Sequence, residues 1–423
     1  MAVGPGPTSM ERMPPSDVGA PPALLRSAVL VAVVGLVLVV GPEVAVLPAA
    51  GWYLLSSVTL PLILLAYRPR RALPIVLVVA AALVVVGGVA RTGEGVDPFH
   101  RHHDGGVVAT EAAARMVVDG RNPYAADFSD ALAPDHLDLD AVDEKGVANP
   151  LIDHYPYLPA AFLVHVPLAA LGSWYDPRIL YVLATAVALG AIARRPAPAP
   201  RRAAALAAAT ASGAVAAFLP WGANDSAAAA LVVLAAFASA RRPVLAGVLL
   251  ALGVSLKALL VVAALPLGIM WLATSRRVAV RAALAAGVTL ALTCVPYLLA
   301  APVDFVEDVV SFNLGTTEMT YPASGVGLGA AFPGVVDGPL LIGLSAALVL
   351  AIAVPGAMWV RRVPRPEVAL FVSGLIVLAG LLPARSFQLS YAPLMVLMWA
   401  PIWLPERDAS DPAGPFGATA ASA

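Results

Sequence analysis

The sequence predicts an all-α polytopic membrane protein with about 12 transmembrane helices. Of its 423 residues, 60% are hydrophobic and only 13% are charged, whereas soluble proteins carry roughly 25% charged residues. The mean hydropathy is +0.84, and the charges stand in short clusters between long apolar runs. The formal net charge of -1 also excludes a strong basic field of the kind that attracts nucleic acid.

Apolar runs of helical length follow one another from residue 24 to residue 404. We expect residues 23–404 to form a single transmembrane domain between disordered cytoplasmic tails at 1–22 and 405–423. The first run is interpreted as an uncleaved span rather than a signal peptide, because further apolar runs follow at once. The predicted spans are Leu24–Val40, Val44–Tyr67, Ala72–Ala90, Ile179–Ala193, Ala203–Pro220, Ser226–Ala240, Val244–Lys257, Ala258–Ala273, Ala282–Ala300, Pro339–Val360, Val368–Leu382 and Leu389–Leu404.

Arginine clusters between these runs determine the predicted orientation. With about 12 crossings, every cluster falls on the same side as both termini, and the positive-inside rule makes that side the cytoplasm. This holds only if residues 156–172 do not cross; Pro156, Pro159 and Pro167 predict a broken, re-entrant or juxtamembrane helix there. The clusters are Arg68, Arg70 and Arg71; Arg194, Arg195, Arg201 and Arg202; Arg241 and Arg242; Arg276, Arg277 and Arg281; and Arg361, Arg362 and Arg365.

The polar residues are concentrated on the predicted outer side. A large extracytoplasmic loop at 91–177, a second outer loop at 301–338 and short turns at 221–225 and 383–388 lie there. The inner loops are short and carry little besides Arg and Pro, as expected of orientation anchors. We therefore expect the functional site to face outward.

Asp104 is the candidate catalytic base in the large outer loop. It precedes a short helix that is predicted over Val107–Asp119 and ended by Gly120. Asp104 is a suitable N-cap for that helix, and it is also a carboxylate near the membrane surface that could accept a proton. Glu111, on the same helical face, is a weaker second candidate.

The sequence gives little indication of a metal site. His102 and His103 beside Asp104 could bind a divalent cation, but consecutive histidines on a loop usually titrate in solvent. The acidic segment at 127–153 lacks the glycine turn and terminal Glu of an EF-hand, so a solvated loop is the simpler interpretation. Cys294 is the only cysteine, which excludes an intramolecular disulfide and a cysteine-based zinc site. We therefore expect no metal or other cofactor.

Lys257 and Arg385 are candidate ligands of a phosphate. Lys257 stands alone in the apolar stretch 244–273, where a charge costs several kcal/mol unless it is paired or hydrated. Arg385 lies between the last two spans on the predicted outer side, against the positive-inside bias, and a phosphate suits its guanidinium fork. The alternative for Arg385 is that its side chain only snorkels to the interface.

Aromatic and amide side chains near the outer loops are candidate substrate ligands. Aromatic rings at this depth usually form interface belts, and stacking on a sugar is a specialised use of the same rings. In the turn at 221–225, an Asx cap on the next helix is the alternative role. The candidates are Tyr124, His154, Tyr155, Tyr157, Asn224 and Asp225.

Several short motifs follow one another in a characteristic order. They are Asp104 with the Ala-rich helix after it, GRNPY at 120–124, HYPYLPAAFLVHVPLAALG at 154–172, WGANDS at 221–226 and the helix pair ending at Lys257. This order resembles the GT-C superfamily of membrane glycosyltransferases, in particular glycosyltransferase family 87. Two features depart from the family: residues 155–159 read YPYLP where a Tyr-x-Tyr-Pro-Pro-like run is typical, and three predicted spans precede the large loop where one is usual.

The resemblance implies a base role for Asp104 and a sugar donor carried on a polyprenyl phosphate. Nucleotide sugars are too highly charged to cross hydrocarbon, so a transferase that faces outward needs a donor delivered by the membrane. We expect inverting transfer of a hexose or pentose, mannose- or arabinose-like, to a glycan or glycolipid of the cell envelope at the bacterial plasma membrane. Arg385 and Lys257 would stabilise the departing phosphate.

A transporter and a non-catalytic assembly or lipid-handling protein of the envelope are the alternatives. About twelve spans with both termini inside is also a common carrier layout. A carrier is expected to show internal repeat symmetry and polar groups at mid-membrane. The sequence shows no such repeat, although Lys257 fits either function.

Overall fold

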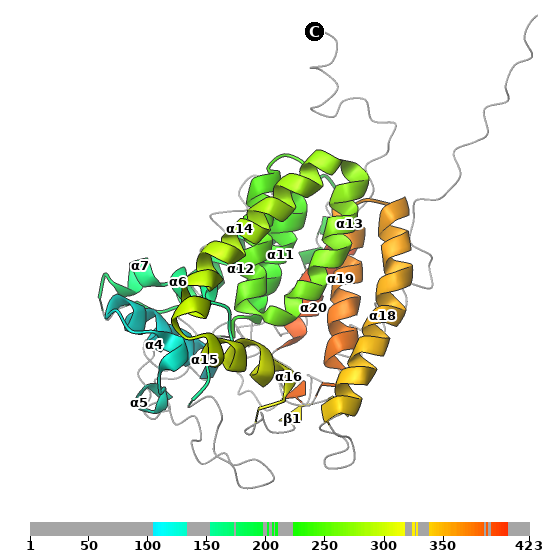
Figure 1. Ribbon diagram of the computed structural model, residues 1–423. Coiled ribbons are helices and arrows are strands. Elements are labelled where there is room, and N and C mark those ends of the chain that lie inside the picture. Colours follow the sequence, from blue (N-terminus) through cyan, green and yellow to red (C-terminus); the bar gives the residue numbers. More distant parts are fainter. Residues whose placement is uncertain are drawn as a thin grey trace, which may run out of the picture. The chain divides into compact units, whose positions relative to one another are not determined.

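The computed structural model describes residues 105–132, 153–172, 175–197, 201–202, 205–206, 208–209, 223–317, 324–325, 327–328, 338–384, 386–387 and 391–404. All of them belong to one unit of the chain, Val33–Pro405, and within them the chain is mostly helical (Figure 1). Outside the described residues lie both predicted tails, most of Ala203–Pro220, and the spans predicted at Leu24–Val40, Val44–Tyr67 and Ala72–Ala90.

The helix predicted after Asp104 is present. α4 spans Gly105–Val118, against a prediction of Val107–Asp119. Gly120 ends it with a φ of 74°, in the left-handed region that glycine adopts without a Cβ penalty. The short 3-10 helix η2 (Pro123–Ala125) follows, and its N-cap Asn122 accepts the backbone N–H of Tyr124 at 3.2 Å.

The proline-rich stretch 156–172 is a broken helix, as predicted. It contains α6 (Ala160–Leu163) and α7 (Val166–Ala169), each of four residues. Pro159 is the N-cap of α6, and Pro167 lies in the first turn of α7, where the missing N–H of proline costs no helical hydrogen bond. Four residues rise only about 6 Å, so neither piece can cross a hydrocarbon core of about 30 Å.

The longer described helices match the predicted spans. Most boundaries agree within a few residues. In hydrocarbon a single segment satisfies its backbone polar groups by forming a helix, so the helices follow the apolar runs. α14 begins earlier than predicted, at Arg276. The elements are α5 (Ser129–Leu132), α8 (Arg178–Ala193), α11 (Asp225–Ala238), α12 (Pro243–Leu256), η5 (Ala258–Ala263), α13 (Ala264–Thr274), α14 (Arg276–Ala300), α15 (Pro302–Val306), the π-helix η6 (Glu307–Ser311), α16 (Phe312–Leu314), α18 (Gly338–Arg362), α19 (Pro366–Leu381), α20 (Ala392–Trp399) and η8 (Ala400–Trp403).

The apolar stretch 244–273 is divided at Lys257, as predicted. α12 ends at Leu256, Lys257 has an extended backbone with φ of -149° and ψ of 99°, and η5 begins at Ala258. The two halves take different neighbours: α12 packs against α11 and α14, whereas α13 packs against α14, α18 and α19. Lys257 therefore lies at a junction of helices.

Small residues form the closest helix contacts. Ala228, Ala229 and Ala230 of α11 are fully enclosed. A Cβ atom on Gly247 of α12 would lie 2.1 Å from the carbonyl oxygen of Ala282 in α14, so these two helices approach each other where glycine leaves room. Close approach through small residues is characteristic of helix packing in membranes.

Many large apolar side chains on the long described helices are exposed. Two of the described helices are long and apolar enough to cross a membrane, Arg276–Ala300 and Leu340–Arg362. Leu292 on the first is 73% exposed, and Leu350 on the second is 62% exposed. Apolar surface of this extent is unfavourable in water and suits a lipid environment.

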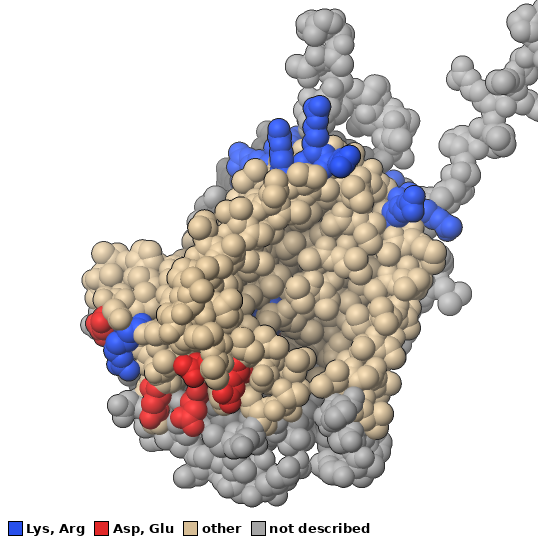
Figure 2. Space-filling view, in the orientation of Figure 1, with Lys and Arg blue, Asp and Glu red and all other residues tan. Residues whose placement is uncertain are grey.

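Charged residues gather at the ends of these helices. On the face shown in Figure 2, the coloured Lys and Arg lie mainly on the side where α14 begins and α18 ends, and the coloured Asp and Glu lie mainly on the opposite side, around α15. The basic side includes clusters predicted from the sequence, with Arg276, Arg277 and Arg281 on α14 and Arg361 and Arg362 on α18.

A short parallel strand pair joins the loop predicted at 301–338 to the connection between α19 and α20. β1 (Ser324–Gly325) pairs with β2 (Ser386–Phe387), and the N–H of Leu328 donates to the carbonyl oxygen of Leu382 at 2.9 Å. The all-α prediction did not include this pair. It holds Ser324 and Gly325 beside Ser386 and Phe387, the two residues that follow position 385 in the chain.

Candidate active site

An ion pair lies among the helices at the break after α12. The Nζ atom of Lys257 is 3.1 Å from Oδ1 of Asp225 and 4.2 Å from the centroid of the Tyr391 ring. The Asp225 side chain is 1% exposed and that of Lys257 is 16% exposed. Asp225 begins α11, and Tyr391 directly precedes α20. Lys257, which is a lone cation in the sequence, therefore has a carboxylate and an aromatic face as partners.

Asn224 fixes the position of this pair. Its Nδ2 atom donates to the carbonyl oxygen of Leu256 at 3.1 Å, one of the carbonyls that a helix leaves without an internal partner at its C-terminus. Asn224 makes no side-chain capping bond to α11, so the Asx cap that was the alternative does not form. Its Oδ1 atom is enclosed and has no hydrogen-bond partner among the described residues, which leaves an acceptor for a ligand hydroxyl. Asn224, Asp225, Lys257 and Tyr391 are called the ion-pair cluster below.

Aromatic side chains form an enclosed wall next to the segment 154–157. The ring of Tyr124 lies 4.9 Å from that of Phe305, and the ring of Tyr155 lies 5.4 Å from that of Phe162, between centroids. The hydroxyl of Tyr124 donates to the carbonyl oxygen of Tyr157 at 2.7 Å. Burial raises the pKa of the Tyr124 and Tyr155 hydroxyls, so both are neutral hydrogen-bonding groups.

The aromatic wall is connected to α4 through Tyr155. The hydroxyl of Tyr155 lies 3.2 Å from Oγ1 of Thr110 in α4, and Thr110 in turn donates to the carbonyl oxygen of Gly106 at 2.7 Å. The first turn of α4, directly after Asp104 in the chain, is thus joined to Tyr155 through Thr110.

A carboxylate from the second outer loop holds the same segment. Oδ1 of Asp308 lies 2.7 Å from Nδ1 of His154, and Oδ2 accepts the backbone N–H of Tyr155 at 2.9 Å. Nδ2 of Asn313 donates to the carbonyl oxygen of Pro156 at 2.9 Å. Burial raises the pKa of Asp308 to about 6, against the lowering effect of its hydrogen bonds. The loops predicted at 91–177 and 301–338 therefore meet at residues 154–156.

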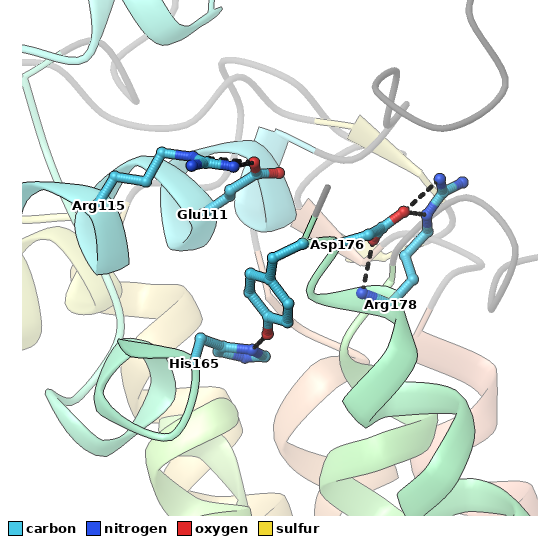
Figure 3. A network of polar contacts seen from close by, with 6 residues as sticks. Glu111, Arg115, His165, Asp176 and Arg178 are labelled. Atoms are coloured by element: carbon cyan, nitrogen blue, oxygen red, sulfur yellow. Dashed lines mark hydrogen bonds and ion pairs between the residues drawn. The ribbon is translucent and has the colours of Figure 1, made fainter. Parts of the chain in front are cut away.

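A second polar network lies along α4 and the start of α8 (Figure 3). Glu111 forms an ion pair with Arg115 at 2.7 Å, so the weaker candidate base is already engaged by a cation. His165 is hydrogen-bonded to the hydroxyl of Tyr175. The carboxylate of Asp176 accepts the backbone N–H of Arg178, the first residue of α8, at 2.8 Å and its Nε–H at 2.7 Å.

Several predicted residues cannot be placed in this geometry. Asp104, His102, His103 and Arg385 lie outside the described residues. Within the described ranges, no group of three or more His, Cys, Asp or Glu side chains is arranged to hold a metal ion.

The structure adds Asp308 and Tyr391 to the site residues that the sequence indicated, and it shows Thr110 and Asn313 as structural links to the segment 154–157. The sequence does not single out Asp308, because Asp304 and Glu307 stand within four positions of it. The bonds of Thr110 and Asn313 to the segment 154–157 join positions far apart in the chain, and no local pattern predicts them.

Comparison with known protein families gives one match. A sequence model of glycosyltransferase family 87 matches residues 155–384, more than half of the chain. The matched part includes the ion-pair residues Asn224, Asp225 and Lys257 together with Asp308, and it excludes Asp104 and Arg385. No curated protein and no solved structure matches the chain significantly. From its sequence match over most of the described helices, the chain belongs to glycosyltransferase family 87, a family of membrane glycosyltransferases.

Proposed function

We propose that the chain transfers a mannose- or arabinose-like sugar from a polyprenyl-phosphate donor to a glycan or glycolipid of the bacterial cell envelope, with inversion. The observation that carries this proposal is the ion-pair cluster, which holds a cation among helices whose outer surfaces are apolar. A lipid-borne phosphate is an anion that can approach such a cation from the membrane. A nucleotide sugar, with its higher charge, would have to arrive through water.

The proposed topology has about 12 spans, with both termini in the cytoplasm and the site on the outer face. The separation of basic and acidic residues in Figure 2 supports this orientation. The division at Lys257 supports it too, because the described helices then alternate in direction with the arginine clusters on one side. In this arrangement the protein is a multi-pass enzyme of the plasma membrane.

Lys257 and Arg385 are the proposed ligands of the donor phosphate. Arg385 precedes Tyr391 by six positions (391 - 385), a chain length of at most about 20 Å, and the ring of Tyr391 lies against Lys257. The two cations can therefore reach one phosphate. Lys257 supplies a charge that Asp225 already orients, and Arg385 supplies a bidentate fork.

An apolar path for the lipid chain leads away from Lys257. Val261 on η5 and Leu265 and Leu272 on α13 are all exposed, and their spacing puts them along one face of η5 and α13. Figure 2 shows a hollow between α14 and α18, the helices against which α13 packs. A polyprenyl chain lying there would leave its phosphate at the Lys257 end.

Asp104 is the proposed base for the transfer. Its carboxylate takes the proton of the acceptor hydroxyl while that oxygen attacks the anomeric carbon. The bond between the anomeric carbon and the phosphate oxygen breaks, and its electron pair leaves on the phosphate, where Arg385 and Lys257 stabilise the added charge. Because a phosphate is a good leaving group, no catalytic acid is needed.

The sugar is proposed to lie between the ion-pair cluster and the segment 154–157. Asn224 offers an enclosed acceptor, and Asp225 borders it. His154 and Tyr157 are partly exposed and suit direct contact. Tyr124 and Tyr155 are enclosed, so their proposed contribution is the wall behind the sugar.

The proposal is tested by incubating the purified protein in lipid with a panel of polyprenyl-phosphate sugars and an envelope glycan acceptor. We expect release of polyprenyl phosphate from one class of donor, together with a glycosylated product of inverted configuration. The matched control omits the acceptor. Release no faster than in protein-free vesicles for every donor would contradict the proposal.

A further inference from the structure

His154 and Asp308 join the two large outer loops. Nδ1 of His154 lies 2.7 Å from Oδ1 of Asp308, although the two residues are 154 positions apart in the chain. The second carboxylate oxygen, Oδ2, accepts the backbone N–H of Tyr155 at 2.9 Å. Both oxygens are thus engaged by the segment that begins at His154, so the carboxylate cannot rotate without breaking one of the two bonds.

The backbone around Asp308 is unusual. η6 is a π-helical turn, a rare form that occurs frequently at functional sites. The Asp308 side chain is 3% exposed, and burying a carboxylate is costly even when it is paired. A link between the loops alone does not require this cost, because Asn313 already binds Pro156 and the ring of Phe312 already packs against His154.

A carboxylate at Nδ1 determines which nitrogen of His154 carries the proton. An ionised carboxylate only accepts hydrogen bonds, so Nδ1 must be the donor, and in the neutral imidazole Nε2 then presents a lone pair. The His154 side chain is 12% exposed, which leaves access for a ligand. His165 provides a contrast, because its Nε2 atom is enclosed without a partner among the described residues.

We propose that Nε2 of His154 accepts a hydrogen bond from a sugar hydroxyl of the substrate, and that Asp308 is the positioning residue that keeps His154 in the accepting tautomer. This inference rests on the proposed glycosyl transfer and specifies one contact within it. A hydroxyl is a suitable donor for an imidazole lone pair. Both the donor sugar and the acceptor glycan carry hydroxyls, and the KM that changes identifies the one that His154 binds.

The carboxylate of Asp308 remains mainly ionised at neutral pH, although its surroundings raise its pKa. Burial raises its pKa to about 6, while the N–H of Tyr155 and the side chain of His154 act in the opposite sense. Asp304, on the preceding helix α15, is a second carboxylate that raises the pKa further. Asp308 can therefore accept the hydrogen bond from His154 at neutral pH.

Two substitutions of His154 separate its two nitrogens. His154→Asn places an amide nitrogen near the position of Nδ1, so it retains a donor for Asp308 but has no group at Nε2. His154→Gln places its amide near Nε2, where the carbonyl oxygen can accept a hydroxyl. Loss of one hydrogen bond predicts that His154→Asn raises the KM of one substrate about tenfold, and that His154→Gln restores part of the loss.

Asp308→Asn tests the positioning role. The amide nitrogen can donate to Nδ1 and so favour the opposite tautomer, and we expect the same KM to rise. Asn313→Ala is the matched control, because it removes another link between the same loops without touching His154, and it should change KM by less than about twofold. Unchanged KM values in His154→Asn, or an equal rise in Asn313→Ala, would overturn the inference.

The tautomer can also be measured without turnover. Nitrogen chemical shifts of the protein labelled with 15N-histidine should show His154 with a proton on Nδ1 in the wild type and on Nε2 in Asp308→Asn. The same tautomer in both would overturn the role of Asp308. A wild type that uses no polyprenyl-phosphate donor would contradict the proposed function instead, and the tautomer measurement would still decide this role.

Discussion

The side-chain nitrogen of Lys257 lies 3.1 Å from the carboxylate of Asp225, in a helical protein whose exposed surface is largely apolar. A single charge in such surroundings costs several kcal/mol, and the pair cancels that charge while keeping the cation at the end of α12. Asn224 and Tyr391 hold the pair from two further positions. The cation is therefore oriented before any ligand arrives, a condition under which electrostatic stabilisation is most effective.

Removing one member of the ion pair should destabilise the protein, and removing both should not. Lys257→Met or Asp225→Leu alone leaves a buried charge without its partner, with an expected loss of about 3–5 kcal/mol. The double variant should recover most of this stability but should remain poor in donor use, because it has no cation. Thermal unfolding and donor KM measured on all four proteins form the test. Full donor use in the double variant would show that the pair is only structural.

Asp104→Asn should abolish most of the turnover while leaving the fold intact. Asparagine caps helices about as well as aspartate, so α4 should still begin at Gly105. The variant lacks a basic carboxylate, and we expect a loss on the order of 10²-fold or more. Turnover and unfolding temperature are measured together, with Glu111→Gln as the matched carboxylate control. Turnover near that of the wild type would remove Asp104 from the mechanism.

Protonation of Asp308 should change activity and stability in opposite directions as the pH falls through about 6. Burial raises the pKa of this carboxyl to about 6, so as the pH falls through about 6 it binds a proton, His154 loses its acceptor and activity declines. Folding favours the protonated form, so the contribution of Asp308 to stability is complete below the unfolded pKa of about 4 and is lost as the pH rises through about 6. Asp308→Asn should lack both effects. An unchanged acid limb in the activity profile of Asp308→Asn would contradict this assignment.

Gly247→Ala should destabilise the contact between α12 and α14. The new Cβ atom would lie 2.1 Å from the carbonyl oxygen of Ala282, so the helices must separate, at an expected cost of about 1–3 kcal/mol. Gly268→Ala and Gly287→Ala are matched controls, because no atom lies within 4 Å of a Cβ at either position. The unfolding temperature should fall only for Gly247→Ala. Equal unfolding temperatures in all three variants would contradict the close approach of α12 and α14.

Hydropathy and charge predict most of the described helices because lipid leaves the backbone few alternatives. The boundaries of α8, α11, α12, α18 and α19 follow the apolar runs, and the break at Lys257 lies where the sequence carries its lone cation. The pairing of β1 with β2 could not be predicted in this way. It depends on a contact between residues 324–325 and 386–387, and short segments carry too little periodic pattern to indicate such a partner.

The candidate site was predicted as separate residues rather than as an arrangement. Different sequence features indicate Lys257 and the pair Asn224 and Asp225, and only the structure shows Lys257 and Asp225 as partners. Asp308 was missed because its function depends on His154, 154 positions away. The burial of Tyr124 and Tyr155 is equally hard to predict from sequence. Tyrosines at this depth are typical of an interface belt, but these two rings pack within the protein.

We propose that this family 87 glycosyltransferase takes its sugar from a lipid phosphate rather than from a nucleotide. The most direct test compares transfer of the same labelled sugar from a polyprenyl-phosphate donor and from a nucleotide donor, in sealed vesicles that contain the protein and the acceptor on its predicted outer side. The proposed mechanism predicts product from the polyprenyl-phosphate donor alone, with one polyprenyl phosphate released for each sugar transferred. Product from the nucleotide donor in the absence of the lipid donor would contradict it.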